Sequence, residues 1–244
     1  MRDTVDTSEA TTRAMRTSAL VAGVGILLSA VLAGLVTVGT IEGLVTEGNA
    51  ARTAQDILAS EGLFRFGIAA LVLVVILDVI VAWALFEFFK VVHPGVSMLA
   101  GWLRLAFAAV FAVAISQLVG ALDLLSNAGY LKTFSTGQLQ TQALLEINAF
   151  DDIWQVGLSI FGLHLSLLGY LVYQSGFAPR WLGVLLVIAG LGYLVDSFGV
   201  LLVASYSVDV KNFTFLGELL LGLWLLVNGG RHHRTGRPGT PDLA

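Results

Sequence analysis

The sequence predicts an all-α membrane protein, a bundle of six transmembrane helices, and two observations support this fold class. First, 57% of the 244 residues are hydrophobic and only 12% are charged, whereas an average soluble domain carries about 25% charged residues. Second, the apolar residues gather in runs of about 20 residues or more, the length at which a helix crosses a bilayer. The runs show no alternation of period two, and backbone groups in lipid must be satisfied within a helix or a closed barrel.

Six apolar runs are long enough to be spans. They are 18–41, 63–89, 96–125, 153–173, 181–203 and 212–228. We expect them to form one membrane domain (18–228), flanked by an N-terminal segment (1–17) and a polar C-terminal tail (229–244) that is disordered. The first run is longer than the apolar part of a secretory signal, about 7–15 residues, so we interpret it as a retained span.

The distribution of Lys and Arg in the short loops predicts the orientation. With six spans both termini lie on one side. That side would collect Arg2, Arg13, Arg16, Lys90, Arg180, Arg231, Arg234 and Arg237. The opposite side would hold only Arg52, Lys132 and Lys211. Both termini are therefore expected to be cytoplasmic, which places the protein in the plasma (inner) membrane of a bacterium.

Two segments on the opposite side are expected to form short helices. Residues 50–61 follow Asn49, a residue type that favours helix N-caps. Residues 136–150 place apolar side chains at helical spacing, which predicts an amphipathic helix lying on the bundle or on the lipid head groups. The tight loops 90–95 and 174–180 contain prolines and predict antiparallel neighbouring spans.

Five ionisable residues lie inside the apolar runs and are the candidate ligand-binding or ion-binding residues. They are Asp78, Arg104, His164, Asp196 and Glu218. An ionisable group in the hydrocarbon core is costly unless it is paired or reaches water, so each one is a functional-site hypothesis.

Counting along the helices places four of the five at one depth. At 1.5 Å per residue, Arg104, His164, Glu218 and Asp78 lie about 12–16 Å from the cytoplasmic ends, and Asp196 about 22 Å. Glycines and alanines recur on the same helical faces, which indicates packed, inward-facing surfaces. Arg104 is the expected partner of Asp78 and Glu218. One arginine cannot satisfy several carboxyls, so at least one carboxyl is expected to be protonated or to touch water.

Simpler interpretations stay open for these residues. The pairing of Asp78 with Arg104 is equally consistent with a clamp between helices. A single membrane histidine such as His164 is more often a hydrogen-bonded core residue than a ligand, and a metal would need two or three further ligands.

Several functional classes find no support in the sequence. There is no cysteine, so disulfides and thiolate chemistry are excluded. There is no phosphate loop, zinc-protease motif or nucleophile elbow, so no catalytic residue, metal or cofactor is predicted; the absence of a catalytic motif argues against an enzyme, but the question stays open. The sequence has no basic stripe of the kind that would indicate nucleic-acid binding. The expected partners are the lipid bilayer and a lipid or small-molecule ligand; the oligomeric state is open.

Several stretches resemble a known family. They are ILASEGLFRFG (57–67), WLRL (102–105), FGLHLSLLGYLVYQSG (161–176), PRWLGVLLVIAGLGYLVDSFG (179–199) and LGELLLGLWLLV (216–227). They are similar to the domain of unknown function 4386 family, mostly bacterial multi-pass membrane proteins, and the match covers about 18–228. The resemblance implies a six-helix membrane protein without indicating an activity. The stretch NAFDDIW (148–154) departs from the family pattern, which tends to carry a His and a Gly-Tyr pair there.

Three functional hypotheses follow from the buried polar layer. The first is proton-linked transport or permeation of a small molecule through a site formed by Asp78, Arg104, His164 and Glu218. The second is a membrane module that binds or senses a lipid or small apolar ligand, with 136–150 as its lid. The third is an intramembrane enzyme that uses a His–carboxylate pair for general acid–base chemistry, which requires a carboxylate within hydrogen-bond reach of His164. A structural subunit whose charges only clamp helices is the simpler alternative to all three.

Overall fold

The computed structural model describes residues 2–126, 133–203, 206 and 216–228, and within this part of the chain all regular structure is helical. The first helix, α1 (Arg2–Val36), continues through a π-helical turn, η1 (Thr37–Ile41), into the short α2 (Glu42–Leu44). The remaining helices are α3 (Ala50–Ala59), α4 (Glu61–Phe89), α5 (Pro94–Ser126), α6 (Thr136–Gln174), α7 (Arg180–Leu202) and α9 (Leu216–Asn228). The all-α prediction is confirmed for the described residues.

Among the described residues, five helical segments are long and apolar enough to cross a membrane: Arg13–Ile41, Glu61–Phe89, Pro94–Ser126, Thr136–Gln174 and Arg180–Leu202. The sixth predicted span appears as α9, with 13 residues, about 20 Å of helix against a hydrocarbon core of about 30 Å. Residues 212–215 of that predicted span, and the tail 229–244, lie outside the described residues. The structure therefore shows a protein with five candidate spans and one shorter apolar helix.

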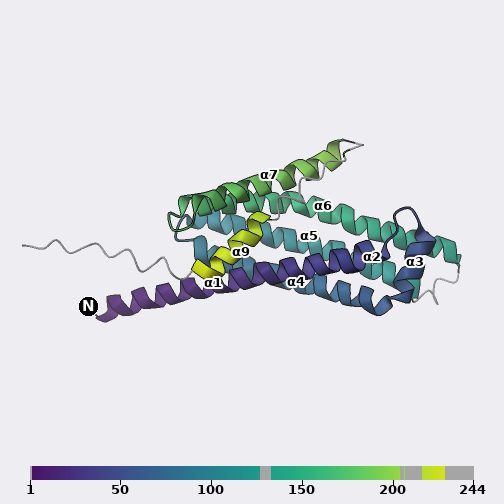
Figure 1. The fold of residues 1–244 in the computed structure, drawn as a ribbon, viewed down its shortest axis with the longest axis horizontal. Helices are drawn as coiled ribbons and strands as arrows, with labels where there is room; N and C mark the ends of the chain where they lie inside the picture. The colour runs from purple at the N-terminus through teal and green to yellow at the C-terminus, as the bar shows by residue number, and fades with distance from the viewer. Residues whose placement is uncertain (1, 127–132, 204–205, 207–215, 229–244) are drawn as a thin grey trace, which may run out of the picture.

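The long helices form a closed ring. Neighbours along the chain pack side by side: α4 with α5 and α6 with α7, as the tight loops 90–95 and 174–180 predicted, and also α5 with α6. α1 packs against α4, and α9 contacts both α1 and α7, so the order around the ring is α1, α4, α5, α6, α7, α9. In Figure 1, α9 lies beside α1, at the end of the bundle that carries the N-terminus.

Glycines bring α6 and α7 into close contact. A Cβ added to Gly162 would lie 2.6 Å from the carbonyl oxygen of Gly190, and one added to Gly169 would lie 2.6 Å from the carbonyl oxygen of Gly183. These two antiparallel pairs, seven residues apart on each helix, fix the register of the hairpin. Small residues of this kind allow helix backbones to approach in lipid.

The structure differs from the prediction of a separate helix over 136–150. These residues are the first part of α6, one continuous helix of 39 residues that begins with a capping box of Ser135 and Gln138. The two acidic residues at 151–152 interrupt the hydropathy of the sequence, but they do not break the helix. Phe150 and Trp154 lie one turn apart, on either side of these acidic residues, and both pack on Phe111 of α5. These contacts stabilise the helix where its hydropathy is lowest.

The apolar stripe predicted for 136–150 is nevertheless buried, with Leu139, Ala143, Ile147 and Phe150 all inside. This part of α6 packs against α3, which Figure 1 places at the end of the bundle remote from the N-terminus. A short helix does follow Asn49: α3 starts at Ala50 and ends at Ala59, two residues short of the expected end, and the side chain of Asn49 accepts a hydrogen bond from the backbone N–H of Arg52.

Candidate functional site

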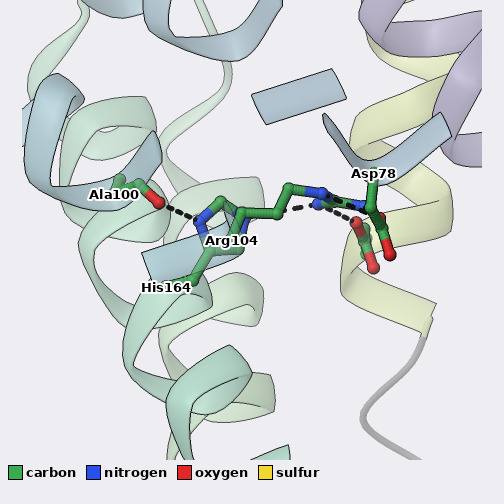
Figure 2. A network of polar contacts seen from close by, with 5 residues as sticks. Asp78, Ala100, Arg104 and His164 are labelled. Atoms are coloured by element: carbon green, nitrogen blue, oxygen red, sulfur yellow. Dashed lines mark hydrogen bonds and ion pairs between the residues drawn. The ribbon is translucent and has the colours of Figure 1, made fainter. Parts of the chain in front are cut away.

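Arg104 is the centre of a polar network in the interior of the ring. It lies on α5 with 2% of its surface exposed. Its Nε and Nη2 donate to the same carboxylate oxygen, Oδ1 of Asp78 on α4, at 3.0 Å and 2.6 Å. Two donors on one carboxylate fix the orientation of the guanidinium plane. Figure 2 shows the arginine extended between Asp78 on one side and His164 on the other.

Glu218 of α9 is the second carboxylate on Arg104. Its Oε1 accepts a hydrogen bond from Nη1 of Arg104 at 2.6 Å. The two carboxylates differ in exposure, with 4% of the Asp78 side chain and 18% of the Glu218 side chain accessible. The sequence-based pairing of Arg104 with both residues is confirmed.

His164 of α6 completes the network on the far side of Arg104. Its Nδ1 lies 2.8 Å from the carbonyl oxygen of Ala100. A carbonyl only accepts hydrogen bonds, so Nδ1 carries a proton. Nε2 lies 3.3 Å from Nη1 of Arg104, which can only donate, so Nε2 is assigned as the unprotonated acceptor and the histidine as neutral. His164 is therefore a hydrogen-bond acceptor for the arginine.

Two members of the site were not predicted. The carbonyl of Ala100 is a backbone group, one turn before Arg104 on the same helix. Every residue has such a group, so the amino-acid sequence does not indicate that this one binds His164. The ring of Phe161 lies 5.4 Å from Cζ of Arg104, a distance at which the cation is attracted to the ring face. Phe161 precedes His164 by three residues, so helical spacing could have identified it as a neighbour.

Asp196 occupies a different level of the bundle. The glycine pairs of α6 and α7 place residue 196 opposite residue 156, and the hydrogen bond from Ser197 Oγ to the carbonyl of Gln155 agrees with this register. That is eight residues, about 12 Å, from the level of His164. Asp196 is 2% exposed, and its Oδ1 accepts a hydrogen bond from Tyr206 at 2.7 Å. The separation expected from the sequence is confirmed.

The charges of the four-residue network do not balance when both carboxyls are ionised. One guanidinium then faces two carboxylates, with a neutral histidine beside them, and the sum is one negative charge. Glu218 is the more accessible carboxyl and accepts one hydrogen bond from Arg104, whereas Asp78 accepts two. Of the two carboxyls, Glu218 is thus the better candidate for the one that was predicted to be protonated or to touch water.

Comparison with known proteins places this architecture in a family. An uncharacterized protein of Archaeoglobus fulgidus is 34% identical over 164 residues, which are 67% of this chain and 84% of that protein. No solved structure matches the chain. The family described as "Domain of unknown function (DUF4386)" matches residues 21–229, a range that includes all four residues of the Arg104 network. The chain belongs to this family.

Proposed function

We propose that the protein moves a small solute across the plasma (inner) membrane in step with protons, and that Glu218 is the group that takes up the proton. The observation that carries the proposal is the difference between the two carboxylates on Arg104: Asp78 accepts two hydrogen bonds and is buried, whereas Glu218 accepts one and is partly exposed. In this proposal residues 212–228 cross the membrane as the sixth span, both termini are cytoplasmic, and Asp78, Arg104, His164 and Glu218 form the binding site.

The interactions around the site divide it into a fixed part and a mobile part. Asp78, Arg104 and His164 join three helices that also pack on one another, α4, α5 and α6. Glu218 reaches Arg104 from α9, which packs on α1 and α7. The ion pair is thus the principal polar attachment of α9 to the centre of the ring.

Protonation of Glu218 would change this attachment. A neutral carboxyl loses its ionic attraction to Nη1 of Arg104, while Asp78 keeps the guanidinium paired and in place. The packing of α9 on α1 and α7 then loosens. Nη1 of Arg104 becomes available to a solute that carries a hydrogen-bond acceptor. A change of protonation can shift such an equilibrium only by its differential interaction with the two states, and the Arg104–Glu218 pair supplies that difference.

A flux measurement tests the proposal. The protein is reconstituted in vesicles that contain a fluorescent pH indicator, and carboxylates, amino acids, sugars and amines are added in turn. We expect at least one solute to drive proton movement through the native protein and not through Glu218→Gln. Asp196→Asn, which alters a buried carboxyl outside the network, is the matched control and should retain the flux. Equal proton movement through the native protein and Glu218→Gln would contradict the proposal.

A labelling experiment tests the loosening of α9 without knowledge of the solute. The chain has no cysteine, so a single cysteine can replace Leu221, which is fully buried on α9. At fixed pH, we expect Glu218→Gln to raise the rate at which a water-soluble maleimide labels this cysteine. A cysteine at Leu182, fully buried on α7, should show no change.

A structural role is the second candidate, and the double hydrogen bond between Arg104 and Asp78 favours it. In that case the network holds α4, α5, α6 and α9 together, and Glu218→Gln would loosen α9 in a clamp as it does in a transporter. The flux measurement separates the two roles, because a clamp alone would show no solute-driven proton movement through the native protein.

A further inference from the structure

An apolar groove of about 330 Å³ opens between α4 and α5. Its walls are formed by Trp83 and Phe86 of α4 and by Met98 and Trp102 of α5. Trp83 is 54% and Trp102 59% exposed, so the groove opens on the outer surface of the ring. Both helices are candidate membrane spans, which makes lipid the medium that faces this opening.

The floor of the groove exists because two residues there are small. Ala82 and Gly101 face each other, and a Cβ added to Gly101 would lie 3.6 Å from the carbonyl oxygen of Ala82 and 3.7 Å from Cβ of Phe86. These are ordinary contact distances, so one methyl group fits there and a longer side chain would fill the groove. The lining is hydrocarbon apart from two indole N–H groups, which suits an alkyl chain and offers little to a hydrated solute.

A charged pair lies at one end of the groove. Val79, Trp83, Phe86 and Lys90 follow one another at spacings of four, three and four, which places them on a single stripe of α4. Nζ of Lys90 lies 5.9 Å from the ring centroid of Phe86, a wall residue, and 2.6 Å from Oε2 of Glu87. Both side chains are partly exposed. The groove therefore leads from hydrocarbon to a neighbouring cation and anion.

From this arrangement we propose that the groove binds one acyl chain of a zwitterionic phospholipid whose head group carries a primary ammonium. The phosphate accepts from Lys90, whose ammonium has three N–H donors and spends one on Glu87. The lipid ammonium donates to Glu87. A quaternary head group has no N–H to donate, and an anionic head group would bring negative charge toward Glu87 without a compensating cation. The proposal does not depend on the transport function.

Quenching of tryptophan fluorescence by brominated acyl chains tests the proposal. Phe replaces Trp154, Trp181 and Trp224, so that Trp83 and Trp102 alone report. The protein is placed in vesicles with a small, equal fraction of brominated phosphatidylethanolamine, phosphatidylcholine or phosphatidylglycerol. We expect phosphatidylethanolamine to be enriched about threefold at the groove over the other two lipids, the effect of one exposed charge-assisted contact.

Variants separate the groove from the head-group contact. Gly101→Ala should keep the enrichment, whereas Gly101→Leu should abolish it. Met98→Phe fills the groove from its exposed rim without adding a tryptophan, and gives the same test if Gly101→Leu fails to fold. Lys90→Gln should remove the head-group preference, and Arg180→Gln, at the start of α7, should not. Equal quenching by the three lipids, enrichment that survives filling of the groove, or a preference for phosphatidylglycerol would each overturn the proposal.

Discussion

At the scale of single residues, Arg104 has the most demanding position in the protein. A guanidinium that is 2% exposed requires partners for its charge, because an unpaired charge in a low-dielectric interior is strongly unfavourable. The structure supplies two carboxylates, a histidine lone pair and an aromatic face. Removing different partners should therefore have different costs, which depend on how deeply each partner is buried.

We predict that Asp78→Asn destabilises the protein more than Glu218→Gln. The Asp78 pair is nearly inaccessible and doubly bonded, so the loss of its charge should cost about 3 kcal/mol. Glu218 is partly exposed and singly bonded, and its neutralisation should cost about 1 kcal/mol. Thermal unfolding in detergent, followed by intrinsic tryptophan fluorescence, gives the order of the midpoints. A lower midpoint for Glu218→Gln than for Asp78→Asn would show that Glu218, and not Asp78, is the stronger partner of Arg104.

At the scale of helices, the α6–α7 hairpin owes its packing to missing side chains. Gly162 faces Gly190, and Gly169 faces Gly183. A Cβ added to any of these glycines would lie 2.4–2.7 Å from the carbonyl oxygen of the facing glycine, which is too close. Ser197 adds one hydrogen bond from α7 to the backbone of α6. Since water is absent from this interface in lipid, close backbone contact replaces the hydrophobic effect as the source of association.

We predict that Gly190→Leu separates α6 from α7 and reduces the yield of folded protein severely. A leucine at this point meets backbone atoms of α6, which cannot move aside as a flexible side chain could. Gly34→Leu is the matched control, because a Cβ at Gly34 meets no atom within 4 Å, and it should leave the yield near the native level. Size-exclusion chromatography of the detergent-solubilised variants measures the outcome; equal profiles would argue against the glycine contacts.

At the scale of the whole molecule, α9 determines how the protein sits in the membrane. In the part of the chain that the structure describes, five helical segments are long enough to cross, and an odd number of crossings would put the termini on opposite sides. The described part of α9 spans about 20 Å, which is less than the hydrocarbon core of about 30 Å. The position of the C-terminus thus reports whether residues 212–228 complete a sixth crossing.

We predict that both termini are cytoplasmic. Green fluorescent protein, which becomes fluorescent in the cytoplasm, should be fluorescent when fused to either end of the full chain. Alkaline phosphatase, which is active only outside the cytoplasm, should be inactive at both ends and active when inserted in the loop before α6. A dark C-terminal fusion with active phosphatase at the same point would establish five crossings.

The sequence was sufficient for those features that depend on spacing along single helices. Counting residues placed Asp78, Arg104, His164 and Glu218 at one depth, and charge then paired three of them. Features that depend on shape or on backbone groups were not accessible in this way. The carbonyl of Ala100 and the groove above Gly101 have no signature in composition. The continuity of α6 was missed because hydropathy falls at residues 151–152 while helix formation does not.

The continuity of α6 has a mechanical consequence. Its 39 residues make a rod of about 58 Å, close to twice the thickness of the hydrocarbon core. The rod carries His164 in its second half, and its first half packs against α3. Without a joint between the two halves, a force that tilts the end near α3 is transmitted along the helix as leverage. A tilt of the end near α3 would thereby displace His164 against Arg104.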